Sequence, residues 1–148
     1  MRSLIRKFRH IKLNRHVFSI DDAIRLCEES GLEIKEQPLD QEGFYLKIHG
    51  KATLHINSNL RSLRWLYVVM HELGHHLLHA SNYQNAAFFC HEQQDSKQHH
   101  EAEAFALMAI LPEPFLRRLL TGDLLNELED YPRELIEKRL RLLDLYGV

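Results

Sequence analysis

Two histidines spaced four residues apart constrain this chain more than any other feature of its sequence. The segment reads His71-Glu72-Leu73-Gly74-His75 and lies in a stretch with helical apolar periodicity. Residues four apart share one face of an α-helix, so His71 and His75 can offer two nitrogens to one metal ion. Glu72 is close enough on the same helix to reach a metal-bound water. Neutral nitrogen ligands with a base beside an open position are what zinc chemistry requires.

A third ligand must come from another part of the chain, since a catalytic zinc usually has three protein ligands and a water. Glu101 and Glu103 are the leading candidates, on a helix expected from about 97 to 111. They lie about 200° apart on a helix and cannot point the same way. Glu101 shares a face with Phe105 and Met108, which should be buried. A carboxylate that faces a core is costly unless it is paired or binds a metal, so the pattern favours Glu101 as the ligand.

Other histidines near these two segments compete for the same role. His99 and His100 adjoin Glu101, and either of them is an alternative third ligand. His79 lies one turn beyond His75. For His79, a carboxylate or carbonyl partner is favoured over the metal, because a helix with the HExxH motif continues under the site rather than over it.

The remaining patterns predict an α+β fold, in which a small antiparallel β-sheet packs on a helical core that carries the motif. Ser19 is a suitable N-cap for a first helix, and Gly31 is a natural end for it. Two strands are expected on either side of a short hairpin loop at residues 49–51. The expected elements are a helix near 20–30, a strand from 32, strands at 44–48 and 52–56, the motif helix, a long loop at 80–98 with an apolar patch at 86–90, a helix at 97–111 capped by Asp95 or Ser96, and one or two helices over 115–146.

Length and composition favour one soluble domain. The chain has 148 residues, of which 45% are hydrophobic, enough for a sizeable core. No apolar run approaches the ~20 residues that a membrane span needs, and the N-terminus lacks the apolar segment of a secretory signal. Cys27 and Cys90 fit no metal-ligand spacing and make a weak case for a disulfide. We therefore expect a cytoplasmic protein with no membrane partner.

Charged residues are distributed unevenly along the chain. The net charge is −2, yet residues 1–20 hold six basic residues and no acidic one: Arg2, Arg6, Lys7, Arg9, Lys12 and Arg15. We predict a basic N-terminal arm at 1–18 and a single metallopeptidase-like domain at 19–148. The arm is interpreted either as a solvated extension or as a surface that faces a partner. Direct nucleic-acid binding is not favoured, because no aromatic-rich RNA-binding signature accompanies these charges.

Two segments together resemble the ImmA/IrrE family of bacterial and phage metallopeptidases. Residues 65–79 match the family's HELGHxxLH motif, and residues 101–112 match its second motif, EANxFAxxLLMP. The resemblance covers roughly residues 20–120 and places the family's metal-binding glutamate at Glu101. It departs from the family at Glu103, where the usual residue is Asn. It implies a gluzincin-like intracellular protease, and members often cleave helix-turn-helix repressors encoded beside them.

The sequence as a whole predicts a zinc-dependent endopeptidase that hydrolyses an intracellular regulatory protein, with a helix-turn-helix repressor as one candidate substrate. Zn²⁺ is expected on His71, His75 and Glu101, with Glu72 as the general base. The substrate peptide is expected to add to an edge of the small sheet. The alternative is a zinc-containing regulatory or partner-binding module without proteolytic activity. Neither the oligomeric state nor a second oxyanion donor follows from the sequence.

Overall fold

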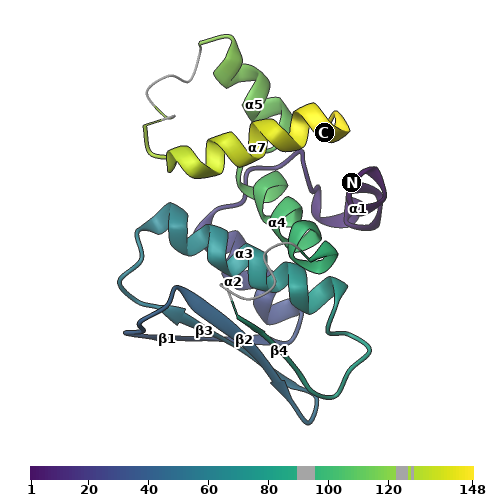
Figure 1. The fold of residues 1–148 in the computed structure, drawn as a ribbon, viewed down its shortest axis with the longest axis vertical. Coiled ribbons are helices and arrows are strands. Elements are labelled where there is room, and N and C mark those ends of the chain that lie inside the picture. The colour runs from purple at the N-terminus through teal and green to yellow at the C-terminus, as the bar shows by residue number, and fades with distance from the viewer. Residues whose placement is uncertain (90–95, 123–126, 128) are drawn as a thin grey trace.

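A four-stranded sheet carries the helices that hold the motif. The structure is a computed structural model that describes residues 1–89, 96–122, 127 and 129–148. In Figure 1 the sheet lies below α3 and α4, while α5 and α7 lie at the opposite end of the molecule. The elements are α1 (Arg2–Lys7), η1 (Arg9–Ile11), α2 (Ile20–Glu29), β1 (Leu32–Gln37), β2 (Gly43–Ile48), β3 (Lys51–Asn57), α3 (Ser62–Leu78), β4 (Ala86–Phe89), α4 (Lys97–Ile110), α5 (Glu113–Leu120) and α7 (Arg133–Tyr146). The α+β class is confirmed.

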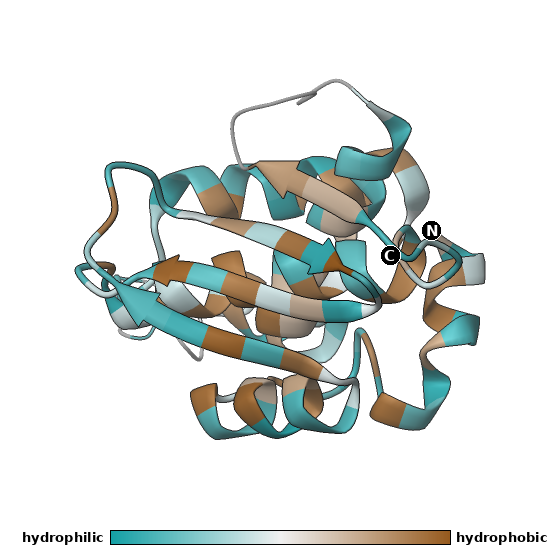
Figure 2. Cartoon of the chain, turned by 90° about the horizontal axis from the view of Figure 1, so that it is seen from below, coloured by the Kyte–Doolittle hydropathy of each residue, from teal (hydrophilic) through white to brown (hydrophobic). Residues whose placement is uncertain are grey.

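The sheet contains the expected hairpin but is mixed rather than wholly antiparallel. Its strand order is β1-β3-β2-β4. Strands β2 and β3 pair antiparallel, and the turn between them uses positive φ at His49 and Gly50. Strand β1 pairs parallel with β3, on the side of β3 away from β2. The hairpin depends on residues close together in the sequence. The place of β1 depends on tertiary structure, because β1 pairs with the edge of β3 that β2 leaves unpaired. Figure 2 shows hydrophobic and hydrophilic residues alternating along the strands, as expected for a sheet with one face on a core.

The apolar patch in the predicted loop at 80–98 forms the edge strand β4. Ala86–Phe89 pairs antiparallel with β2, where Phe88 lies opposite Tyr45. The expectation of a continuous loop was therefore wrong for these four residues. The segment is too short to show a clear period, and its pairing with β2 joins distant parts of the chain. Cys90 lies outside the described residues.

Helix α2 begins and ends where the sequence predicts. Ser19 is its N-cap, and its hydroxyl accepts a hydrogen bond from the backbone N–H of Asp22. The Asp22 carboxylate in turn accepts one from the Ser19 backbone N–H, which completes a capping box. Gly31, with φ of 73°, follows the helix. For α4, Ser96 is the N-cap, while the other candidate, Asp95, lies outside the described residues.

Close packing of α4 on α3 sets the position of the site. A Cβ atom added at Gly74 would lie 3.2 Å from the Cα atom of Ala102 and 3.2 Å from the Phe105 ring. Small residues on both helices, Gly74 and Ala102, therefore allow the two backbones to approach closely. Every residue from Trp65 to His75 of α3 is buried.

The N-terminal segment belongs to the same core as these helices. Leu4, Phe8, Leu13 and Phe18 are buried in the main hydrophobic cluster. The Phe8 ring meets the Phe105 ring of α4 edge to face at 5.0 Å. Residues 1–18, which the sequence set apart as a basic arm, thus have a buried apolar side.

Helix α7 is joined to the rest of the molecule by the buried guanidinium of Arg139. This side chain donates hydrogen bonds to the carbonyls of Leu111 and Val148 and to the side chain of Asn14. Burial lowers the pKa of Arg139 to about 10. Among the described helices, none has the length and hydropathy to cross a membrane.

Candidate metal centre

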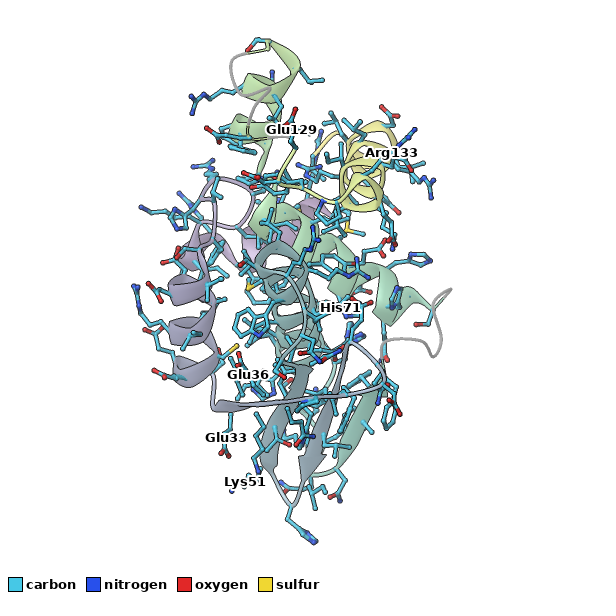
Figure 3. All side chains as sticks on the ribbon, turned by 90° about the vertical axis from the view of Figure 1, so that its left-hand side faces the viewer. Glu33, Glu36, Lys51, His71, Glu129 and Arg133 are labelled. Atoms are coloured by element: carbon cyan, nitrogen blue, oxygen red, sulfur yellow. The ribbon has the colours of Figure 1, made fainter. Side chains whose placement is uncertain are left out.

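The two histidines of the motif lie side by side in the interior on α3. His71 and His75 are 5% and 4% exposed, and their ring centroids are 4.9 Å apart. Figure 3 shows His71 inside the molecule, whereas Glu33, Lys51 and Arg133 extend from its surface. The Nε2 atom of His71 is buried and has no hydrogen-bond partner among the described residues. An unpaired buried polar atom is costly, and a metal ion at this nitrogen would remove the cost.

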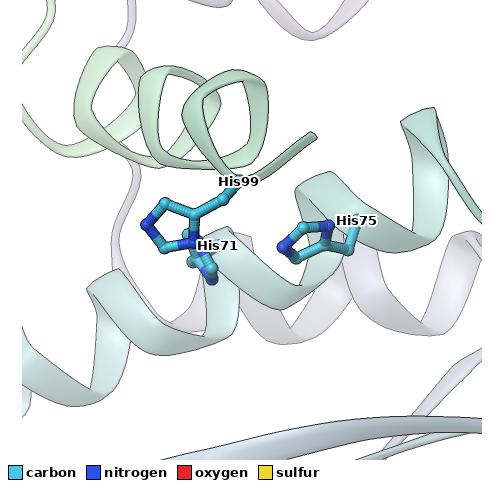
Figure 4. Close-up of side chains that lie close together, drawn as sticks. All are labelled: His71, His75 and His99. Atoms are coloured by element: carbon cyan, nitrogen blue, oxygen red, sulfur yellow. The ribbon is translucent and has the colours of Figure 1, made fainter. Parts of the chain in front are cut away.

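His99 of α4 is the third histidine of a cluster with His71 and His75. One ring nitrogen from each of the three residues can be chosen so that all lie within 4.8 Å of one another. Figure 4 shows the His99 ring reaching down from α4 toward the two rings on α3. Three imidazole nitrogens are a donor set suited to zinc and related divalent metals. The described residues therefore fit a metal ion at this place.

Glu101, the ligand favoured by the sequence, lies beside His79 and outside the three-histidine cluster. Its carboxylate is 3.6 Å from Nε2 of His79 and 3.9 Å from Nζ of Lys97. The expected carboxylate partner of His79 is thus Glu101 itself. The sequence favours Glu101 because it shares a helix face with Phe105, but every residue from Ala104 to Ile110 is buried. Burial of Phe105 therefore does not define one inward face of α4.

Glu72 lies beside the cluster, as the motif predicts. It is fully buried, and its Oε1 atom is 3.3 Å from Nδ1 of His71. A buried carboxylate beside histidines that can bind a metal has the chemistry of a general base.

Electrostatics keep the central histidine neutral. Burial, helped by the neighbouring His71, His79 and His99, lowers the pKa of His75 to about 2. A neutral imidazole is the form that binds metal, so His75 is ready to act as a ligand at neutral pH. Its Nδ1 atom lies 3.0 Å from Nδ1 of His79. His79 therefore connects His75 to Glu101.

Strand β4 forms one wall of the site. The Phe88 ring stacks on the His75 ring, with centroids 4.2 Å apart and planes 13° from parallel. A small cavity of about 40 Å³ lies between β4, His75 and His99. Since β4 is the last strand in the sheet order, an edge of the sheet lies next to the histidine cluster.

Comparison with known proteins agrees with this geometry. The Peptidase M78 family model, described as the IrrE N-terminal-like domain, matches residues 27–141. The chain belongs to this family. Within it, the chain is similar to the metallopeptidase ImmA of Bacillus subtilis (strain 168), with 31% identity over 104 residues. That match covers 68% of the chain and 60% of the length of ImmA. No solved structure matches the chain.

As a member of the M78 family, the chain has a metallopeptidase-like core, and the resemblance seen in the sequence is confirmed. The sequence offers His99 only as an alternative ligand, because it adjoins Glu101. His99 and Glu103 are four residues apart and share a face of α4, but the sequence does not show which face meets α3. That face, rather than the face of Glu101, points to His71.

Proposed function

We propose that this chain is a zinc-dependent endopeptidase. The observation that carries the proposal is the convergence of His71, His75 and His99 beside the buried carboxylate of Glu72. Histidine ligands alone would serve a structural site equally well. The buried carboxylate beside them supplies, in addition, the base that activation of a bound water requires.

The proposed zinc ligands are His71, His75 and His99. The unpaired Nε2 atom of His71 and the spacing of the three rings support this set. Glu101 is the ligand implied by the family resemblance, and it becomes the rival to His99. When bound, zinc would supply a Lewis acid that polarises the water and the scissile carbonyl.

Glu72 is the proposed general base. It would accept a proton from the attacking water and then transfer that proton to the leaving nitrogen, so that the carboxylate is restored after each turnover. The surrounding α3 residues are all buried, which excludes bulk water from this side of the carboxylate. Helix α3 therefore holds the proposed base, Glu72, and two of the proposed zinc ligands, His71 and His75, in fixed positions.

The substrate is proposed to be a protein segment that binds in extended form along the outer edge of β4. Main-chain hydrogen bonds to an edge strand are a common way to hold a peptide irrespective of its sequence. Phe88, which stacks on His75, would bring such a segment close to the metal ligands. A regulatory protein, such as a helix-turn-helix repressor, is the proposed substrate class, from the family resemblance.

A Glu72→Gln variant tests the enzyme against the alternative of a zinc-binding module without activity. The assay would incubate the zinc-loaded protein with the small helix-turn-helix repressors of the same genome, each in turn, and identify fragments by mass spectrometry. We expect the wild type to cleave the repressor and Glu72→Gln to retain zinc but produce no fragments. Equal cleavage by both proteins would remove Glu72 from the mechanism, and cleavage by neither would favour the module.

Variants of His99 and Glu101 test which of these two α4 residues is the third zinc ligand. We expect His99→Ala to weaken zinc binding by more than the roughly 10–100-fold loss typical of outer-shell changes, because a direct ligand is lost. Glu101→Ala should stay within that range, since Glu101 contacts His79. Titration of each zinc-loaded protein with a chelator measures the affinities. The reverse order would assign the ligand to Glu101.

A further inference from the structure

Glu103 of α4 lies at the centre of a small polar cluster behind His99. Its Oε2 atom accepts a hydrogen bond from Nζ of Lys138 at 2.8 Å and one from the hydroxyl of Tyr67 at 3.4 Å. The same oxygen lies 3.6 Å from Nε2 of His99. These contacts bring together residues from α3, α4 and α7, so the cluster is a feature of the tertiary structure.

We propose that Glu103 is a positioning residue that orients His99 toward the metal, and that Lys138 of α7 holds Glu103 in place for this role. The proposal rests on the proposed function, in which His99 is a zinc ligand. It assigns to Nε2 of His99 the task of donating to Glu103, which leaves Nδ1 of His99 to bind the metal.

The chemistry of metal-bound histidine supports this assignment. A histidine ligand commonly donates its second ring N–H to a carboxylate, which fixes both the tautomer and the orientation of the ring. Glu103 is four residues after His99 on α4, so both side chains lie on one helix face. The Glu103 side chain is only 17% exposed, which limits competition from water for its oxygen atoms.

Lys138 is the cation that pairs with Glu103. Its Nζ atom lies 2.8 Å from Oε2 of Glu103, and the Lys138 side chain is 30% exposed. Lys138 also lies 3.3 Å from Glu134 on the surface of α7. The cluster thus extends from the metal ligands to a helix that supplies no ligand itself.

Glu101 does not share this role, although it is only two residues away. Its carboxylate lies next to His79 and Lys97, on another side of α4 from Glu103. The two carboxylates of α4 therefore act on different histidines. Glu103 faces His99 directly, while Glu101 reaches His75 only through His79.

The first test measures zinc affinity by chelator competition in Glu103→Gln, Lys138→Met and the control Glu137→Gln. Glu137 forms an exposed ion pair with Arg133 on the same helix as Lys138. We expect about 10–100-fold weaker binding for Glu103→Gln and a smaller loss for Lys138→Met. The control should equal the wild type. The absorption spectrum of the cobalt-substituted protein should also change in Glu103→Gln, because the ligand field depends on the orientation of His99.

His99→Ala in the same experiment separates the proposed ligand set from the positioning role. If His99→Ala keeps its zinc, the proposed ligand set fails. If His99→Ala loses zinc but Glu103→Gln binds within twofold of the wild type with an unchanged cobalt spectrum, only the positioning role is overturned.

A second measurement on the wild type does not depend on whether a variant folds. Nitrogen-15 NMR of histidine-labelled, zinc-loaded protein reports which ring nitrogen carries the proton. We expect a protonated Nε2 and a metal-bound Nδ1 for His99. A metal-bound Nε2 in His99 would overturn the proposal.

Discussion

Helix α3 and the N-terminal segment 1–18 both combine ionisable and apolar residues, but they bury opposite kinds. In α3 the ionisable side chains His71, Glu72 and His75 are buried. In the N-terminal segment all six basic residues are exposed, while apolar residues such as Leu4 and Phe8 are buried. The first arrangement costs free energy unless a bound group compensates for it, whereas the second is an ordinary amphipathic surface.

The contrast shows that a run of charged residues in the sequence is a weaker sign of a functional site than ionisable side chains that the fold buries. The basic residues of 1–18 suggest a surface for a partner, yet they accompany a segment that stabilises the core. His75 of α3 carries no charge at neutral pH, because burial lowers its pKa to about 2. The importance of the α3 histidines lies in where the fold places their nitrogen atoms.

The largest effect should come from removing a buried histidine of α3. We expect His71→Ala to abolish zinc binding, because one of the two motif nitrogens is lost. The metal-free variant should still fold, since the substitution removes a buried Nε2 atom that has no partner among the described residues. Metal analysis and circular dichroism would test both points. His10→Ala, at an exposed position in the N-terminal segment, is the control and should keep the wild-type zinc content.

The next effect concerns the buried side of the N-terminal segment. Phe8→Ala should lower the free energy of unfolding by about 3–5 kcal/mol, the usual cost of removing a buried aromatic ring. Zinc content per folded molecule should be unchanged, because Phe8 is not part of the site. Urea denaturation measures the loss.

The matched control for Phe8→Ala is Arg6→Gln, which changes a charge on the exposed side of the same segment. Its stability should stay within about 0.5 kcal/mol of the wild type. If Phe8→Ala were as stable as the wild type, residues 1–18 would be a separate arm, as the sequence alone predicted.

The smallest effect should come from a partly buried charge near the surface that has specific partners. The backbone N–H of Ser19 and the ring of His16 lower the pKa of the Asp22 carboxyl from its ordinary value of 3.8. A carboxyl with a lowered pKa in the folded state stabilises the fold above its unfolded pKa and loses this contribution as the pH falls through the folded value. Asp22→Asn should therefore be less stable than the wild type at pH 7.

The difference between wild type and Asp22→Asn should shrink as the pH falls below about 4 and through the lower pKa of folded Asp22, because this carboxyl then becomes protonated whereas Asn is uncharged at every pH. Urea denaturation at several pH values would follow it. Replacing the other half of the capping box, Ser19→Ala, should cost about 1 kcal/mol at all these pH values, since a hydroxyl does not titrate in this range. A pH-independent effect of Asp22→Asn would show that the carboxylate charge contributes nothing.

Local features of the fold were predictable because they depend on short segments. The i, i+4 spacing of His71 and His75 fixes their common face in any helix. Ser19 and the turn at His49 and Gly50 likewise determine a helix start and a hairpin through neighbouring backbone groups. The family motif added Glu101 but carried no information on how α4 is rotated in this chain.

Tertiary packing decided the features that connect distant segments. Close contact between Gly74 and Ala102 sets how α4 lies on α3, and that contact brings His99 to the cluster and leaves Glu101 at His79. No periodic pattern reveals this rotation, because α4 is buried on nearly all sides from Ala104 onward. Sequence by itself determined that two histidines and a glutamate lie on one helix, with both histidines on the same face. Only the packing of a second helix decides which of its polar side chains reaches them.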